Sequence, residues 1–287
     1  MADLITTDWE VQLGDLLLGG ETPYALVGTE GLLSIPEVIS ADRGRLQRHG
    51  GIPGEDFLGA RTVVFQWEIY ATGPEFSRLL EALATATSPG GRERPVYFRI
   101  PGVAGGGVRC IFARPRKRDL PVDLTYFYGA PIATVEWVAT DPRIYDAAEH
   151  TVSVGLPAGT GEGLEFPATD PLTFGTRPTA GSVTVTNAGN FPTPARYRID
   201  GPCVNPRIEN VTTGAVLAFR WTLEEGQWLD VDTNARTVRL NGTANRYEAL
   251  YEPGWADLAP GDNEIAFRAA TSSEDATLSV TWRSAWV

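Results

Sequence analysis

The sequence predicts a mainly β protein of two domains, and three observations support this prediction. Apolar and polar residues alternate along most of the segments that lie between turn residues, which is the pattern of half-buried strands. Only one segment has apolar residues at the spacing of an amphipathic helix. The chain of 287 residues is long enough for two hydrophobic cores, and Asp141-Pro142 marks a natural boundary near its middle.

The first half, residues 1–147, predicts a sheet with one packed helix. Residues 9–18 have the form of a β-hairpin. A clean strand pattern follows over residues 62–70, with alternate apolar side chains on one face: Val63, Phe65, Trp67 and Ile69. Four further strands are expected over residues 95–100, 108–114, 122–128 and 131–139. The segment 42–54, rich in small residues, is expected to be an exposed loop.

The single helix is expected to end before Ser88-Pro89. Thr72-Gly-Pro-Glu75 has the form of a capping box with a proline in the first turn. The apolar face of this helix would consist of Phe76, Leu79, Leu80 and Leu83.

The second half, residues 148–287, predicts an all-β sandwich that follows an irregular linker over residues 156–179. Residues 196–200 alternate polar and apolar side chains, and Gly201-Pro202 ends that strand. Leu229 and Val231 face the core before a turn of Asp, Thr and Asn residues, and the same period continues over residues 237–241, 264–268 and 277–283.

Composition excludes several classes of protein. The 24 basic and 36 acidic side chains give a net charge of −12, and both halves are acidic, which argues against a nucleic-acid-binding surface. No run of about 20 apolar residues and no secretory signal are visible, so we expect assembly in a cytoplasm and no membrane insertion. Cys110 and Cys203 do not have metal-ligand spacing, and Cys110 is expected to be a small buried hydrophobe.

No catalytic, cofactor-binding or metal-binding site is predicted, and the chain is expected not to be an enzyme. Asp230-x-Asp232-x-Asn234 resembles the start of a calcium loop, but Ala235 replaces the required glycine, so a hairpin turn is expected. Gly159-x-Gly161-x-Gly163 lacks the strand-loop-helix frame of a phosphate site. His49 and His150 are a hundred residues apart and pair with no evident nucleophile.

Several short motifs occur in an order that resembles the siphophage distal tail protein family. In the second half these are Gly189-Asn190-x-Pro-Thr-Pro194, Asn205-Pro206 with a Thr-Gly turn ending at Gly214, the Asp230-x-Asp232 hairpin with Leu240-Asn-Gly242, and Trp255 to Asn263. Near the start, Leu18-Gly-Gly20 followed by Thr22-Pro-Tyr24 is similar to the opening of the same family. The resemblance implies an N-terminal belt domain, of the β-sandwich or split-barrel type with one α-helix, and a galectin-like C-terminal β-sandwich.

The resemblance also implies a function. Members of the family form a ring, expected to be a homohexamer, at the distal end of a long non-contractile phage tail. The ring joins the tail tube protein to the tail-associated hub protein of the baseplate, with a receptor-binding protein or the tape measure protein as further partners. DNA would pass through the lumen only as cargo, and the expected location is the virion tail tip.

The basic segment from Arg114 to Arg118 is the candidate contact site, through Arg114, Arg116, Lys117 and Arg118. Complementary patches allow identical subunits to close a ring, so these side chains are expected to pair with an acidic neighbour; a solvated hairpin tip and a phosphate contact are the other interpretations. The alternative function is carbohydrate binding, in which the second domain recognises host cell-wall glycans through tryptophans. Most of the five candidates are nevertheless expected in the core: Trp221, Trp228, Trp255, Trp282 and Trp286.

Overall fold

The computed structural model describes residues 2–157, 181–255, 257–271 and 275–287, and the chain divides into two units. Unit 1 comprises Met1–Ala147 with Trp286–Val287, and unit 2 comprises Ala148–Ala285. The last two residues therefore join the first unit, whereas the sequence analysis assigned them to the second. The predicted mainly β fold is confirmed in both units. Most of the predicted linker, including the Gly159-x-Gly161-x-Gly163 segment, lies outside the described residues.

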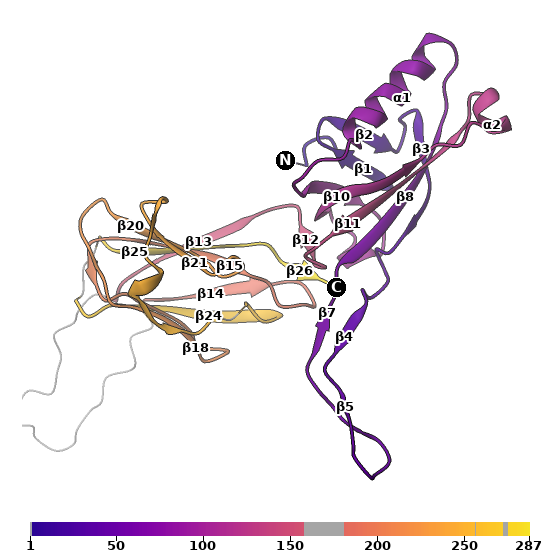
Figure 1. The fold of residues 1–287 in the computed structure, drawn as a ribbon. Helices are drawn as coiled ribbons and strands as arrows, with labels where there is room; N and C mark the ends of the chain where they lie inside the picture. The colour runs from indigo at the N-terminus through magenta and orange to yellow at the C-terminus, as the bar shows by residue number, and fades with distance from the viewer. Residues whose placement is uncertain (1, 158–180, 256, 272–274) are drawn as a thin grey trace, which may run out of the picture. The chain divides into compact units, whose positions relative to one another are not determined.

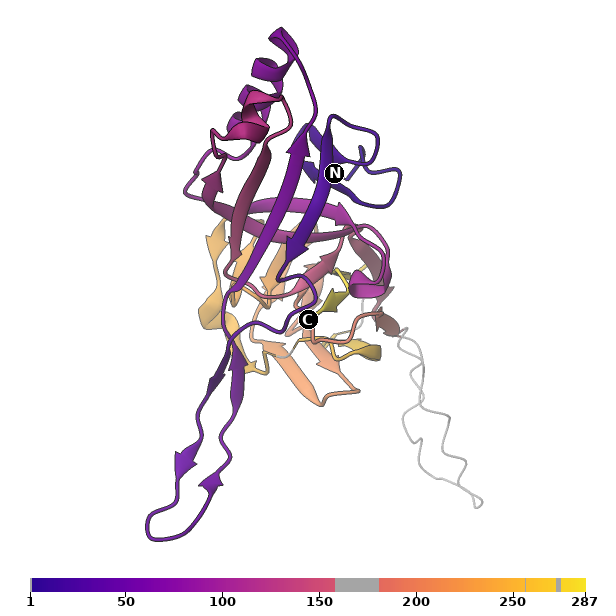
Figure 2. The ribbon, with the colours of Figure 1, turned by 90° about the vertical axis from the view of Figure 1, so that its right-hand side faces the viewer.

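Unit 1 is built on a sheet that the long strand β10 divides into two parts (Figures 1 and 2). The first half of β10 (Arg109–Asp119) pairs with β9 (Arg94–Arg99), and its second half pairs with β11 (Ile132–Ala139). The strand order is β2-β1-β9-β10-β11-β8-β3, and β12 and β26 pair outside this path. The remaining strands are β1 (Glu10–Leu13), β2 (Leu16–Gly19), β3 (Tyr24–Glu30), β8 (Arg61–Ile69), β12 (Ile144–Asp146) and β26 (Ala285–Trp286).

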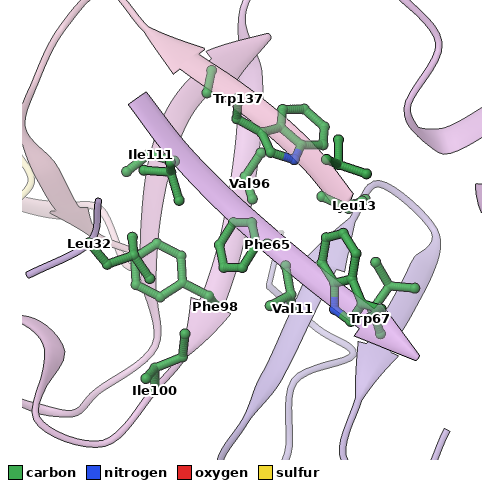
Figure 3. Packing of buried hydrophobic residues seen from close by; sticks show 14 of the residues in the cluster. Val11, Leu13, Leu32, Phe65, Trp67, Val96, Phe98, Ile100, Ile111 and Trp137 are labelled. Atoms are coloured by element: carbon green, nitrogen blue, oxygen red, sulfur yellow. The ribbon is translucent and has the colours of Figure 1, made fainter. Parts of the chain in front are cut away.

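The core of unit 1 lies between these two parts of the sheet (Figure 3). Phe65 and Trp67 of β8 stack with ring centroids 5.4 Å apart, and they meet apolar residues from β1, β9, β10 and β11. The alternation predicted for β8 is therefore confirmed, with every second residue buried. Helix α1 (Pro74–Ala86) buries Leu79 and Leu83 against the same core, and the Tyr24 hydroxyl donates to the Leu79 carbonyl at 2.8 Å.

Two predictions for unit 1 are wrong in detail. No capping box forms, because the N-cap of α1 is Gly73, at φ 64°, and no side chain caps the helix. Glu75 contacts Arg78 instead, at 3.2 Å. The strand expected over residues 122–128 is replaced by the short helix α2 (Leu124–Phe127). Asp123 causes this change, since its carboxylate accepts the backbone N–H groups of residues 125 and 126 as an N-cap does.

The segment expected to be a loop is a two-stranded ribbon, which we call the arm (residues 37–59). β4 (Val38–Ser40) pairs with β7 (Asp56–Leu58), and β5 (Arg43–Gly44) pairs with β6 (Gly51–Ile52). Both views show the arm extending away from the rest of unit 1, at the end opposite to α1 and α2 (Figures 1 and 2). The predicted exposure is thus confirmed, but the chain there is paired backbone rather than a plain connector.

Unit 2 is a sandwich, as predicted. One sheet has the order β13-β25-β15-β20-β21-β22 and the other has the order β14-β24-β17-β18-β23. Their inner faces enclose a second core. The strands of the first sheet are β13 (His150–Gly155), β15 (Ala195–Asp200), β20 (Trp228–Asp232), β21 (Thr237–Leu240), β22 (Ala244–Asn245) and β25 (Thr277–Trp282).

The second sheet of unit 2 has five strands. They are β14 (Ser182–Asn187), β17 (Arg207–Asn210), β18 (Ala215–Phe219), β23 (Leu250–Pro253) and β24 (Gly261–Arg268). A separate pair consists of β16 (Cys203–Val204) and β19 (Thr222–Leu223), and the 3-10 turns are η1 (Val103–Gly105) and η2 (Tyr247–Ala249).

Candidate assembly surfaces

The basic segment predicted as a contact site lies inside strand β10, so the hairpin-tip interpretation is wrong. The register of β10 against β11 shifts between Pro115 and Lys117, which forms a bulge. Proline has no N–H to donate to the ladder and is tolerated at such irregularities, so a strand continues where the sequence suggested a turn. The chain reverses later, around α2.

The structure does not bring the four predicted residues together into one surface. Arg118 donates to the Ala84 carbonyl at 2.8 Å and to the Thr87 hydroxyl at 2.9 Å, so it ties β10 to the C-terminal end of α1. Lys117 is 3.9 Å from Asp119 across exposed side chains, and Arg114 is only half-exposed. Arg116 is exposed. Arg116 and Lys117 therefore stay predicted contacts, whereas Arg118 has a structural role.

The arm carries apolar side chains in solvent. Ile39 and Phe57 are partners across its two strands and are 57% and 58% exposed, and Leu46 near the tip is 93% exposed. Val38 and Ile52 are exposed as well. A two-stranded ribbon has no second layer against which to bury such residues, and exposed apolar strands mark sites of association. The arm is therefore the strongest candidate for an interface in unit 1.

The tip of the arm is also basic. Residues 43–52 contain Arg43, Arg45 and Arg48, all exposed, and no acidic residue, in a chain whose net charge is −12. Opposite charges steer association and fix its register. An acidic surface, such as that of another copy of this chain, is thus the complementary partner for the tip.

A buried arginine fixes the root of the arm. Arg61, which directly follows the arm, is 1% exposed and donates to the carbonyls of Pro142 at 2.7 Å, Gly31 at 2.7 Å and Ser34 at 2.9 Å. Burial lowers the pKa of this guanidinium. These bonds join the segments on both sides of the arm to the main sheet. Sequence reasoning missed Arg61, although it stands at a position of β8 where the alternating pattern places a core residue.

A second exposed apolar surface surrounds α2, at the end of unit 1 away from the arm (Figure 1). Its members are Val122, Leu124, Phe127 and Tyr128, and Phe127 is 83% exposed. Phe76 of α1 packs edge-on against Tyr126 with ring centroids 5.2 Å apart, and both line a pocket of 230 Å³ beside this surface. The hydroxyl of Thr125 and the N–H of Tyr126 lower the pKa of Asp123, which stabilises the helical turn that presents these side chains.

In unit 2, two asparagines hold turns: Asn187, which precedes the Gly189-Asn190 motif, and Asn263, which ends the Trp255–Asn263 motif. Asn187 is buried, donates to the carbonyl of Phe191 at 2.8 Å, and accepts from the N–H of Gly189 at 3.1 Å. Asn263 is fully buried, donates to the carbonyl of Ala259 at 2.8 Å and accepts from its N–H at 3.0 Å. A side-chain amide satisfies buried backbone groups of both kinds, which explains why these turns contain asparagine.

Most candidate tryptophans pack as expected. Trp221, Trp255 and Trp282 lie against the core of unit 2. Trp286 belongs to unit 1, where the Arg109 guanidinium lies 4.0 Å from its ring centroid. Trp228 differs, because it stands on the outer side of the six-stranded sheet in register with Asp200.

The residues weighed for catalysis lie apart. His49 is at the tip of the arm in unit 1, and His150 lies beside Trp282 in unit 2. The Asp232 carboxylate accepts the N–H of Ala235 at 2.9 Å, in the turn that joins β20 to β21, which confirms the hairpin. Among the described residues, no group of His, Cys, Asp and Glu side chains has the arrangement of a metal site. Both cysteines are buried, and burial raises the pKa of Cys203 to about 11.

Within the described part of the chain, no helix is long and apolar enough to cross a membrane.

Residues 188–286 match the family model of the siphovirus-type tail component, C-terminal domain. No curated protein sequence matches the chain significantly.

Two solved structures resemble the whole chain. One is the SPP1 Dit protein (gp 19.1), described as a paradigm of the hub adsorption apparatus in phages that infect Gram-positive bacteria. It has a TM-score of 0.62 and 15% identity, and the match covers 92% of this chain and 94% of that chain. The other, from the phage P2 baseplate in its activated conformation, has a TM-score of 0.50 and 9% identity over 95% of this chain and 96% of that chain. The match over residues 188–286 confirms the predicted resemblance to the siphophage distal tail protein family for that part of the chain, and the fold is shared over nearly the full length.

Proposed function

We propose that this chain is a structural, non-enzymatic virion protein that forms a ring at the distal end of a long non-contractile phage tail. The family match in unit 2 and the fold shared with a hub adsorption protein support a role at the tail tip. The observation that carries the ring is the arm, which exposes apolar side chains that a lone copy leaves unburied.

The two ends of unit 1 suit head-to-tail association. The arm lies at one end and the apolar surface around α2 at the other (Figure 1). A contact between two different surfaces of identical subunits is heterologous, and it generates a ring when the rotation closes. Unit 1 would thus act as the belt, and a homohexamer is the expected closure.

The proposed ring connects the tail tube protein to the hub protein, with assembly in the host cytoplasm. A receptor-binding protein or the tape measure protein would dock on the ring as a further partner. Arg116 and Lys117, exposed on β10, are candidate contacts for these partners. The acidic balance of the chain suits a lumen through which DNA passes as cargo, because like charge keeps the duplex from adhering to the wall.

The experiment compares two double variants by light scattering after size exclusion. Ile39→Ser with Phe57→Ser removes the apolar pair of the arm but keeps its backbone pairing. Tyr247→Ser with Tyr251→Ser removes a matched pair of half-exposed aromatic side chains from unit 2 and serves as the control. We expect the arm variant to dissociate at concentrations at which the unchanged chain and the control remain assembled. Equal assembly of all three proteins would contradict the proposal.

A further inference from the structure

The outer face of the six-stranded sheet of unit 2 forms a polar groove of 610 Å³. The strand register places its side chains in two rows. One row holds Thr151, Thr281, Arg196, Asp232 and Thr237, and the next includes Arg198, Asp230 and Arg239. The groove falls within the range of roughly 300–1,000 Å³ that small-molecule sites occupy.

The groove carries both charges in balance. Three arginines, at positions 196, 198 and 239, and three acidic residues, Glu149, Asp230 and Asp232, line it. The local sum is therefore zero, whereas the chain as a whole carries −12. A balanced surface repels neither sign as a whole, and it offers no net attraction to a phosphate, an acidic peptide or a cation.

One end of the groove is held rigid by its own contacts. Arg198 donates to Asp200 through two nitrogens, at 3.0 Å and 2.8 Å, and its guanidinium lies 4.5 Å from the ring centroid of Trp228. The indole N–H of Trp228 donates to one carboxylate oxygen of Asp230 at 2.9 Å. Trp228 thus positions Asp230, and Arg198 with Asp200 holds Trp228.

Arg196 and Arg239, unlike Arg198, do not hold a neighbouring side chain in place among the described residues. Arg196 faces Asp232 in the register, and Arg239 faces Asp230. Residues that face each other on neighbouring strands have Cβ atoms about 5 Å apart. Yet within the described residues neither guanidinium forms an ion pair or hydrogen bond. Free donors and carboxylate acceptors therefore alternate across adjacent strands, at a spacing of about 4.8 Å.

This alternation has a specific chemical complement. A hydroxyl group both donates and accepts, so a polyhydroxylated molecule satisfies guanidinium donors and carboxylate acceptors at once. Hydrogen bonds to charged partners are stronger than those between neutral groups. A phosphate or carboxylate ligand would bond to the arginines but would be repelled by Asp230 and Asp232 beside them.

We propose that this groove binds an uncharged oligosaccharide, with Asp230 and Asp232 accepting hydrogen bonds from sugar hydroxyls and Arg196 and Arg239 donating to them. Trp228 is a positioning residue for Asp230. The site is distinct from the arm and from self-association, so it adds a recognition function to the proposed structural one. It also differs from sugar binding through a row of exposed tryptophans, because three of the five candidates pack against the core of unit 2 and Trp286 belongs to unit 1.

The test uses the full chain on an array of oligosaccharides. The neutral probes are oligomers of glucose, galactose, mannose and N-acetylglucosamine, and the charged probes contain uronic acids or phosphate groups. We expect binding to at least one neutral probe, and its affinity is then measured by calorimetry for a set of variants. Binding to no neutral probe, or to charged probes alone, would overturn the proposal.

The variants are Asp232→Asn and the double change Arg196→Gln with Arg239→Gln, and the control is Arg78→Gln, an exposed arginine of unit 1. Loss of one charged hydrogen bond corresponds to roughly a tenfold weaker affinity. We expect at least that loss for the groove variants and none for the control, with thermal melting unchanged in all of them. Trp228→Phe keeps a ring but removes the N–H, and we expect a smaller loss of affinity.

Two results would assign the groove to something else. Groove variants that bind the neutral sugar as well as the unchanged chain does would place the sugar elsewhere. Groove variants that instead lose attachment of another tail protein, with no sugar bound by the unchanged chain, would make the face a protein docking site.

Discussion

The arm of unit 1 and the grooved sheet face of unit 2 are both exposed β surfaces, but their chemistry is opposite. The arm presents apolar pairs such as Ile39 and Phe57, without a second layer. The sheet face presents rows of Arg, Asp and Thr over a sandwich that is already closed by its own core. The first surface is incomplete in a single copy, whereas the second is complete and solvated.

The difference indicates which partner each surface suits. Apolar surface gains about 25 cal/mol for each Å² removed from water, so the arm gains most from a protein surface that covers it. An apolar partner would remove water from the charged rows without replacing its hydrogen bonds. A hydroxyl-rich ligand would replace those hydrogen bonds and so offset the cost of removing the water. The proposed assembly and the proposed recognition thus fall on different units, because the two exposed surfaces differ in polarity.

The largest effect expected is that of removing the arm tip. Residues 41–54 can be replaced by a short Gly-Ser-Gly linker, because Ala41 and Gly54 lie side by side at this level of the ribbon. We expect complete loss of the oligomer, with the β signal in circular dichroism retained and sugar binding by the groove unchanged. An oligomer that persists without the tip would remove the tip from the interface and leave the Ile39–Phe57 pair as the contact.

The next effect concerns the root of the arm. Arg61→Met leaves the carbonyls of Gly31, Ser34 and Pro142 buried without their donor. We expect the free energy of unfolding of unit 1 to fall by about 3 kcal/mol, as when a buried charged hydrogen-bond network is broken. Urea titration measures this change, with the exposed Arg78→Met as control at about 0.5 kcal/mol or less. A loss for Arg61→Met no larger than for the control would contradict a structural role.

A smaller effect is expected in unit 2. Asn263→Ala removes the amide that satisfies the backbone of Ala259, and we expect a loss of about 2 kcal/mol from unit 2. Because this turn belongs to unit 2 and the arm belongs to unit 1, the mass of the oligomer should not change. Asn234→Ala, at an exposed position in the β20–β21 turn, is the matched control. A change in oligomer mass with Asn263→Ala would mean that assembly depends on unit 2 as well.

The smallest expected signal is the reaction of Cys203 with a thiol reagent. Burial raises the pKa of this thiol to about 11, so at pH 8 the reactive thiolate is scarce and shielded. We expect no reaction in the folded chain and full reaction in urea. Rapid modification of Cys203 in the native protein would show that the sandwich beneath the grooved face opens readily, and the contrast with the arm would weaken.

Most strands could be predicted because apolar and polar residues alternate along them, and this alternation directly reflects which side chains are buried. Strands β8 and β15 could each be predicted from their own residues alone, without knowledge of their partner strands. Strand β10 was expected to end at Arg114, and only its pairing with β11 shows that the strand continues past Pro115 through a bulge. Asp123 caps a short helix within residues 122–128, where a strand was expected.

The two surfaces were harder to predict for a physical reason. The arm has short strands with many small residues and arginines, so no alternation identifies it. The groove depends on which residues of different strands stand opposite one another, as Arg196 and Asp232 do, and register is a property of tertiary structure. The basic segment stood out in the sequence, but its most engaged member, Arg118, bonds to α1.

The central claim is that the arm makes this chain an assembling protein. The most direct test is native mass spectrometry of the full chain over a range of concentrations, which counts the copies of the 31.0 kDa polypeptide in the particle. We predict a closed oligomer, since heterologous contacts form a ring when their rotation closes, and about six copies, as the family resemblance implies. A monomer at every concentration would contradict the claim.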